Sequence, residues 1–241
     1  MRGDQRRAEL KAIAAENEAI LSRGFYQHPE TGSVAIETAT KRAAHVTWSY
    51  APQDLSGLLA DLINRDARAR TRFEVTSESS LQAALRLKSK DHGTVGVLNF
   101  ASATKPGGGY LTGATAQEED LCRCSALYRC LLQAGDCYAH NRHRDPFYSH
   151  RVIYSPDVPV FRDHHYALLP GPYLASFLSC PAPNAGEIVG GSPERLAQIR
   201  GGRIQNPSHR RRLFSITSSS PCTTGRARSS LAAFRSAFEE G

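Results

Sequence analysis

The chain has 241 residues, of which 40% are hydrophobic, and a formal net charge of +7 at pH 7. This length allows one large domain or a domain with an extension, and the hydrophobic fraction excludes a disordered tail. Because no apolar run approaches the length of a membrane span, we expect no membrane partner, while the excess of positive charge favours an anionic one.

The amino-terminal part of the chain alternates helical and extended patterns. The first helix has an apolar stripe at helical spacing, and Gly24 is a suitable residue to end it. The expected elements are a helix over 4–22, a turn over 28–32, a strand or helix over 34–44, a strand over 46–50 and a helix over 54–63.

The rest of the chain alternates strands with helices, which implies an α/β sandwich around a mixed sheet. The helix over 117–134 is the clearest, because its apolar residues fall largely on one side. The expected elements are strands over 72–76, 95–100, 152–155, 158–161 and 174–179, and helices over 77–87, 117–134 and 193–199. With no internal repeat or clear linker, we expect a single domain over 1–241, with an amino-terminal extension (1–70) and a core (71–241).

The six cysteines form no Cys-x-x-Cys pair, and no pair of histidines stands at zinc spacing. Cys122, Cys124 and Cys130 fall on the helix expected over 117–134. We therefore expect no metal and reduced thiols that pack within a cytoplasmic protein. The amino terminus agrees with that location, because it leads into an amphipathic helix and not into an apolar signal core.

The most informative segment begins where the apolar strand ends, at Asn99. Three consecutive glycines follow, Gly107, Gly108 and Gly109. Glycines strip side chains from a turn, free its backbone N–H groups to approach a ligand, and allow positive φ without steric cost. A flexible connector is the plainer alternative for the glycines alone.

Polar residues open the long helix just after this loop: Gln117, Glu118 and Glu119. Acidic residues in a first turn often form only a solvated helix start that the helix dipole favours. Placed directly after a strand and a glycine-rich turn, they repeat the arrangement by which α/β proteins hold ligands at the carboxyl end of a strand. Such a loop suits a ligand that carries phosphates and a bond that awaits acid catalysis.

The segment from Asn99 to Tyr128 closely resembles the signature of the microbial-type poly(ADP-ribose) glycohydrolases, macrodomain enzymes marked by Gly-Gly-Gly and then Gln-Glu-Glu. The segments 147–163 and 173–186 are also similar to that family. The resemblance implies a macrodomain-like three-layer sandwich, in which helices flank a central mixed sheet, with an amino-terminal helical extension.

The activity implied by the resemblance is hydrolysis of the ribose–ribose O-glycosidic bonds of poly(ADP-ribose), with release of ADP-ribose and without a cofactor. By resemblance, Glu119 is the general acid that protonates the departing ribose oxygen and then helps to activate water. Glu118 holds the ribose hydroxyls, and Gln117 supports the site. The expected partners are poly(ADP-ribose), ADP-ribose and ADP-ribosylated proteins, and we expect a monomer.

The resemblance also implies a set of substrate-binding residues. Asn99 contacts the terminal ribose, while Gly107, Gly108 and Gly109 wrap the diphosphate and the reacting ribose. Asn184 lies in a Pro-Ala-Pro-Asn loop that either borders the site or is a plain turn.

Glu119 faces opposing influences on its proton. The start of a helix favours the ionised carboxylate, whereas burial, the charge of Glu118 and a bound diphosphate favour the protonated acid. We expect the protonated form only in the substrate complex, with the two carboxyls titrating as a coupled pair.

The chain departs from the family near its carboxyl end. The family normally closes with an apolar strand and a second glycine-rich loop whose aromatic residue stacks on adenine. Residues 205–230 contain no such motif, and the Ser/Thr/Arg-rich stretch 213–230 is expected to be a loop. Two other functions therefore stay open: a macrodomain that binds ADP-ribose or its polymer without cleaving it, and a nucleic-acid-binding protein, suggested only by the positive charge.

Overall fold

The most apolar strand of the chain lies inside a mixed sheet. The computed structural model describes residues 2–55, 73–90, 93–142, 148–181 and 215–218. Within these residues the strand order is β3-β5-β6-β4-β7, in which β4 and β6 are parallel and the other neighbours antiparallel. The strands are β3 (Trp48–Tyr50), β4 (Thr94–Ala101), β5 (Val152–Arg162), β6 (Leu168–Pro181) and β7 (Ser215–Ser218).

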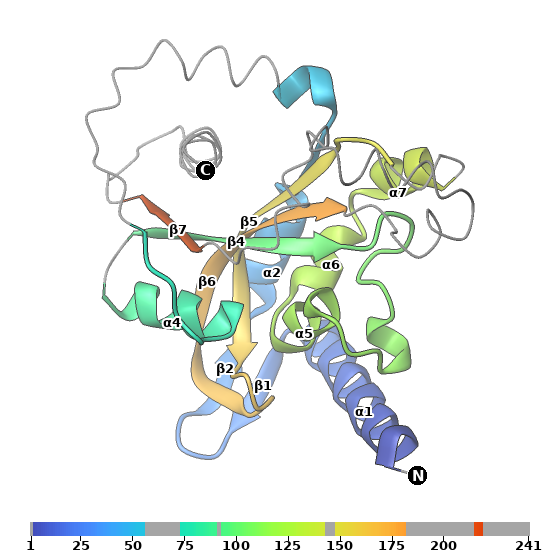
Figure 1. Ribbon diagram of the computed structural model, residues 1–241. Helices are drawn as coiled ribbons and strands as arrows, with labels where there is room; N and C mark the ends of the chain where they lie inside the picture. Colours follow the sequence, from blue (N-terminus) through green and yellow to red (C-terminus); the bar gives the residue numbers. More distant parts are fainter. Residues whose placement is uncertain (1, 56–72, 91–92, 143–147, 182–214, 219–241) are drawn as a thin grey trace.

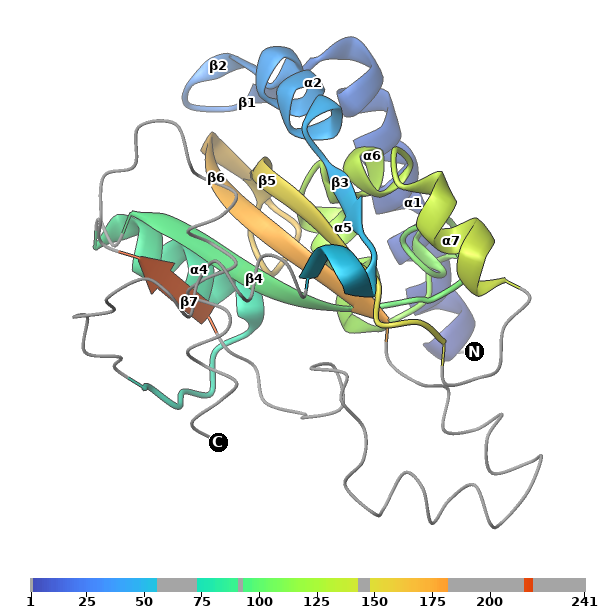
Figure 2. The same cartoon turned by 90° about the horizontal axis from the view of Figure 1, so that it is seen from above.

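Helices flank this sheet, and several of them gather on one of its faces (Figure 1, Figure 2). A hairpin of β1 (Phe25–His28) and β2 (Gly32–Ala35) joins the first two helices of the chain. The helices are α1 (Arg2–Arg23), α2 (Glu37–His45), α4 (Ser80–Ser89), the 3-10 helix η1 (Tyr110–Thr112), α5 (Gln117–Cys124), α6 (Leu127–Leu131) and α7 (Gly135–Asn141). The predicted fold class, an α/β fold with a central mixed sheet flanked by helices, is confirmed.

The strands divide their apolar side chains between two clusters. Val95 and Val97 of β4 join the larger core, which contains side chains of α1, α2, α5, α6 and α7. Leu98 lies in the smaller cluster, on the opposite side of the strand, with Leu178 of β6. Burial on both faces explains why this strand reads as a continuous apolar run.

The first helix follows its sequence pattern closely. Helix α1 ends at Arg23, and Gly24 then adopts a left-handed φ of +83° while its N–H bonds to the carbonyl of Ile20 at 2.8 Å. The buried residues of α1 include Leu10 and Ala14. The segment 34–44, for which the sequence left a strand and a helix open, contains the end of β2 and most of α2.

The single helix expected over 117–134 is wrong, because it breaks at Ser125. There the backbone is extended (φ −144°, ψ 175°) and forms a bridge with Val160, while the N–H of Ala126 bonds to the carbonyl of Pro159 at 3.0 Å. The hydroxyl of Ser125 donates to Leu121 and accepts from the N–H of Leu127, replacing lost helical bonds. Apolar spacing cannot reveal this break, since the pairing with β5 that causes it is tertiary.

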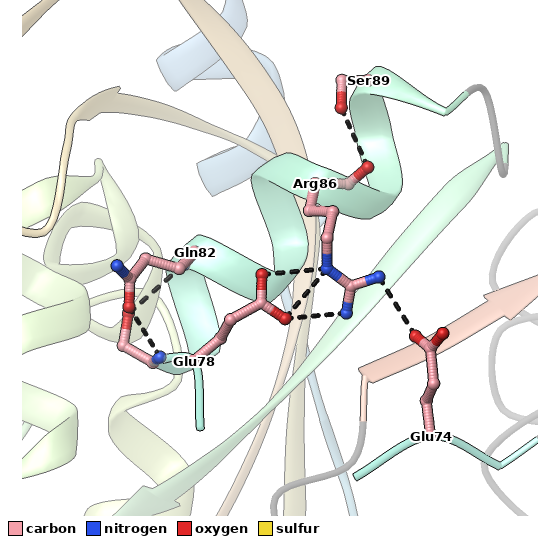
Figure 3. A network of polar contacts seen from close by, with 6 residues as sticks. Glu74, Glu78, Gln82, Arg86 and Ser89 are labelled. Atoms are coloured by element: carbon pink, nitrogen blue, oxygen red, sulfur yellow. Dashed lines mark hydrogen bonds and ion pairs between the residues drawn. The ribbon is translucent and has the colours of Figure 1, made fainter. Parts of the chain in front are cut away.

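The strand expected over 72–76 is also wrong in its described part, since residues 73–76 have no regular structure. This stretch is tied to α4 by side chains (Figure 3). The guanidinium of Arg86 donates to Glu78 at 2.9 Å and to Glu74 at 3.0 Å. Helix α4 itself agrees with the prediction of a serine-capped helix, and Ser79 is its N-cap.

Two further expectations about strands need correction. The separate strands over 152–155 and 158–161 are one strand, β5, with an irregularity at which Asp157 has a φ of +50°. The stretch 213–230, expected to be a loop, contributes β7, which pairs with β4.

The helices expected over 54–63 and 193–199 fall largely or wholly outside the described residues. The division of the domain at residue 70 falls there too, and all three stay predictions.

Replacing Ser79 by Ala tests the start of α4. The Ser79 hydroxyl accepts the N–H of Gln82, and the Gln82 side chain accepts the N–H of Ser79. We expect Ser79→Ala to lower the free energy of unfolding by about 1 kcal/mol, measured by urea denaturation. Ser79→Thr is the control, since it keeps the hydroxyl and most of the stability; equal losses in both variants would contradict the capping role.

Candidate functional site

The predicted site residues of β4, the glycine loop and α5 come together at the carboxyl end of β4 (Figure 1). The N–H of Phe100 donates to the Gln117 side chain at 2.9 Å. The N–H of Ser102 donates to Glu118 at 2.7 Å. The N–H of Gly109 donates to Glu119 at 2.7 Å. Backbone N–H groups of β4 and of the loop therefore hold all three side chains that open α5.

Gln117 fastens the start of α5 to the sheet. Its amide nitrogen donates to the carbonyl of Leu98 and to the hydroxyl of Ser80, both at 3.0 Å. Both amide hydrogens of Gln117 are therefore donated within the protein, and its amide oxygen accepts the N–H of Phe100. Gln117 thus has no N–H left to offer a ligand, and its part in supporting the site stays a prediction.

Gly108 sits against both carboxyls. Its φ is +56°, and a Cβ added there would lie 2.5 Å from Oε1 of Glu119 and 3.1 Å from Oε2 of Glu118. Gly107 has a φ of +65°, and its Cβ would lie 2.8 Å from the ring of Tyr128. Only glycine satisfies both the backbone conformation and the space at these two positions.

The loop amides are directed mainly into the protein. Gly108 donates to the carbonyl of Lys105 at 3.0 Å, and Gly109 donates to Glu119. In this arrangement the glycines bring backbone donors to a carboxylate. Whether the loop also wraps a diphosphate, as its sequence predicts, stays a prediction.

Glu118 is 2% exposed, and its surroundings favour the neutral acid. Burial, reinforced by the charge of Glu119, raises the pKa of Glu118 to about 8, although the hydrogen bond from the N–H of Ser102 opposes the rise. Its carboxyl therefore retains a proton near neutral pH. Glu119, one residue further on, is 7% exposed.

Two buried oxygens at the site accept no hydrogen bond within the described part of the chain: Oδ1 of Asn99 and Oε1 of Glu118. Asn99 is fully buried, and its amide nitrogen donates to the hydroxyl of Ser179, its partner in the β4–β6 register, at 3.0 Å. This bond sets the orientation of the Asn99 amide. A buried acceptor without a donor costs about 1–3 kcal/mol, so the pair suits a ligand that brings hydroxyl groups.

Arg123 is a supporting residue that sequence reasoning missed. It lies one helical turn after Glu119, is fully buried, and donates to the carbonyl of Ala114 and to Asp120. Its own carbonyl accepts the side chain of Asn17 in α1. Asn17 in turn accepts the side chain of Arg162 at 2.7 Å. The one available signal was an arginine placed between two cysteines on the apolar side of a helix.

The remaining predictions about side chains have mixed outcomes. Asn184 and Cys222 lie outside the described residues. The five described cysteines are buried and form no disulfide with one another, as expected for packing residues. Among the described residues, no cluster of His, Cys, Asp and Glu could hold a metal ion, and no helix is long and apolar enough to cross a membrane.

Residues 14–163 match the family model described as the microbial-type PARG catalytic domain. The comparison with curated proteins returned no match.

Solved structures of bacterial poly(ADP-ribose) glycohydrolases are similar to this chain. The enzyme from Thermomonospora curvata is 41% identical, with a TM-score of 0.76, over 96% of this chain and 77% of that one. A structure of the Thermomonospora curvata enzyme bound to the inhibitor ADP-HPD is 40% identical, with a TM-score of 0.72, over 96% and 76%. The Deinococcus radiodurans enzyme in complex with ADP-ribose is 42% identical, with a TM-score of 0.60, over 66% and 63%.

Replacing Gly108 by Ala tests the packing of the loop against the carboxyls. Alanine would be strained at the φ of +56° that Gly108 adopts, and its Cβ would displace both carboxyl groups. We therefore expect the free energy of unfolding to fall by about 1–3 kcal/mol. Gly171→Ala is the matched control, because nothing lies within 4 Å of its added Cβ. Equal effects of the two substitutions in chemical denaturation would contradict the close approach.

Replacing Glu118 by Gln tests the raised pKa. The folded protein keeps the Glu118 proton up to about pH 8, whereas an unfolded glutamate loses it near 4.5. The stability that this preference provides is present below pH 4.5 and is lost as the pH rises towards 8. We expect Glu118→Gln, which mimics the neutral acid, to gain in Tm relative to the wild type as the pH rises from 5 to 9. A constant difference over that range would show that the Glu118 pKa is unshifted.

Proposed function

We propose a function for this chain from the family to which it belongs, the microbial-type PARG catalytic domains: it hydrolyses the ribose–ribose bonds of poly(ADP-ribose) and releases ADP-ribose. The chain is also similar to a poly(ADP-ribose) glycohydrolase over 96% of its length. The reaction follows from the family. The geometry of the site supports the roles that we assign to particular atoms of this chain.

The observation that carries the proposal is a pair of buried acceptor oxygens next to the carboxyl group of Glu119. Oδ1 of Asn99 and Oε1 of Glu118 lack donors within the described residues. A ribose supplies neighbouring hydroxyl groups, which are donors of the required kind. With these hydroxyls bound, the adjacent Glu119 is the group available to act on the glycosidic bond.

Glu119 has one oxygen fixed and one available. Oε1 accepts the N–H of Gly109, and the other oxygen makes no hydrogen bond within the described part of the chain. In its protonated form, Glu119 donates a proton to the departing ribose oxygen as the bond from that oxygen to the anomeric carbon breaks. The resulting carboxylate then takes a proton from water, whose oxygen attacks the anomeric carbon. The two products share the atoms of one water, and Glu119 regains its proton.

The neighbouring acid provides a source for the catalytic proton. Glu118 retains its proton near neutral pH because it is buried beside Glu119. Ribose hydroxyls that donate to Glu118 stabilise its ionised form and favour release of this proton. Both carboxyls pack against the same residue, because a Cβ at Gly108 would lie 2.5 Å from Oε1 of Glu119 and 3.1 Å from Oε2 of Glu118. We therefore assign Glu119 as the group that receives the released proton. The pair therefore shares one proton between substrate binding and acid catalysis.

The wider setting is also part of the proposal. The chain acts as a single domain and a monomer, in the cytoplasm, on polymer attached to ADP-ribosylated proteins. Five buried cysteines without a mutual disulfide suit a reducing compartment. Asn184 belongs to the substrate loop, and Gly107, Gly108 and Gly109 approach the diphosphate and the reacting ribose.

A second candidate function is binding of ADP-ribose or its polymer without cleavage. The observation that favours it is the composition of residues 205–230, which lack a second glycine-rich loop. Incubation with labelled poly(ADP-ribose) separates the candidates: release of ADP-ribose supports the enzyme, and retention of intact polymer supports the binding module.

Replacing Glu119 by Gln tests its catalytic role. Loss of the transferable proton should lower the rate of ADP-ribose release at least about 100-fold, while calorimetric titration still detects ADP-ribose binding. Glu30→Gln, on the exposed β1–β2 turn, is the control and should retain the full rate. A Glu119→Gln enzyme with more than half of the wild-type rate would refute the assignment.

A further inference from the structure

A second recognition feature lies next to the catalytic loop, where α1 passes η1. A pocket of about 410 Å³ opens there between the amino-terminal half of the helix and the loop. This half of α1 projects beyond α5 and α6 in Figure 1. The lining residues are Asp4, Arg7, Ala8, Lys11 and Thr112.

Two cationic groups in this pocket are available to a ligand. Arg7 uses its Nε to donate to the carbonyl of Thr112 at 2.9 Å, and its two terminal nitrogens make no hydrogen bond within the described residues. Lys11 is exposed and forms no ion pair there. Asp4 is the one acidic lining residue, so the pocket side chains carry a net positive charge. Phosphate groups are the ligands that this combination favours.

The pocket is built onto the loop that holds the catalytic carboxyl. Both the N–H and the hydroxyl of Thr112 donate to the carbonyl of Gly109 at 3.0 Å, and the N–H of Gly109 donates to Glu119. Gly113, with a φ of +78°, brings its backbone so close to α1 that an added Cβ would lie 2.3 Å from the carbonyl oxygen of Arg7. The guanidinium is therefore held in place relative to the site, which lowers the entropy lost when it binds an anion.

We propose that this pocket binds a diphosphate of poly(ADP-ribose) from a unit other than the one being cleaved. The inference rests on the proposed function, because only a polymeric substrate extends beyond the catalytic site. It assigns Arg7 and Lys11 a part in recognising chain length that a single ADP-ribose does not require. Among the described residues, no lining side chain of this pocket is aromatic, so the pocket offers contacts to phosphate and not to bases. Single-stranded DNA also carries phosphates, and the test therefore includes it as a competing occupant.

Charge reversal at Lys11 tests the proposal. Lys11→Glu should raise the Kd for fluorescent poly(ADP-ribose) of defined length about tenfold and lower the slope of log K against log salt by about 1. It should leave the Kd for ADP-ribose unchanged. Lys11→Gln should give an intermediate effect, and thermal melting should show that both variants fold. Arg42→Glu is the control with the same change of charge, because Arg42 is exposed on α2 and forms no ion pair within the described residues.

Each contrary outcome has a clear meaning. A Kd of Lys11→Glu for the polymer equal to that of Arg42→Glu, or an equal loss of affinity for polymer and for ADP-ribose, would overturn the proposal. An equal loss for single-stranded DNA would show a general polyanion surface and would also overturn it. Polymer that binds to the wild type but yields no ADP-ribose would refute the proposed function, whereas the effect of Lys11→Glu on binding would still stand.

Discussion

The close approach of the Gly108 backbone to two carboxyl groups is the constraint on which the site depends. The loop can pack against Glu118 and Glu119 only because Gly108 has no side chain, since an added Cβ would lie 2.5 Å from Oε1 of Glu119 and 3.1 Å from Oε2 of Glu118. The same turn supplies the N–H of Gly109 to Glu119, and Ser102 supplies one to Glu118. These two N–H groups thus offset part of the electrostatic repulsion between the adjacent carboxyls and part of the free-energy cost of burying them.

The rest of the fold holds this loop and the start of α5 in a fixed relation. Gln117 bonds to β4 on one side, while Arg123 bonds on the other to Ala114, at the end of the loop. Helix α1 completes the support, because Asn17 accepts from Arg162 of β5 and donates to the Arg123 carbonyl. Replacing a buried arginine in such a network by an uncharged or shorter side chain leaves its partners without a hydrogen-bond donor. The amino-terminal helix is therefore part of the structure that positions the acids.

Local features of the sequence were sufficient to predict much of this arrangement. The apolar strand that became β4, the serine cap of α4 and the glycine that ends α1 each depend on short-range physical chemistry, although β4 runs on to Ala101, two residues beyond Asn99. The break at Ser125 and the irregularity at Asp157 could not be predicted in the same way, because both arise from pairing with distant strands. The glycine motif and the two glutamates were recognisable as a site, but the buried contacts of Arg123 were not.

The sequence also left the distribution of protons between the two acids open. Adjacent glutamates at a helix start suggested a coupled pair, yet only three-dimensional burial identifies Glu118 as the residue whose pKa is raised. A neutral Glu118 lowers the cost of burying an oxygen that has no donor within the described residues. In the proposed mechanism, that oxygen receives a hydroxyl group of the ribose. A neutral Glu118 also connects recognition of hydroxyl groups with delivery of a proton, which is the central claim of the mechanism.

A crystal structure of this protein with ADP-ribose bound would test that claim most directly. We expect ribose hydroxyls within hydrogen-bonding distance of both Asn99 Oδ1 and Glu118 Oε1, with Glu119 beside the anomeric carbon. A ribose bound elsewhere, with these two oxygens still lacking donors, would contradict it.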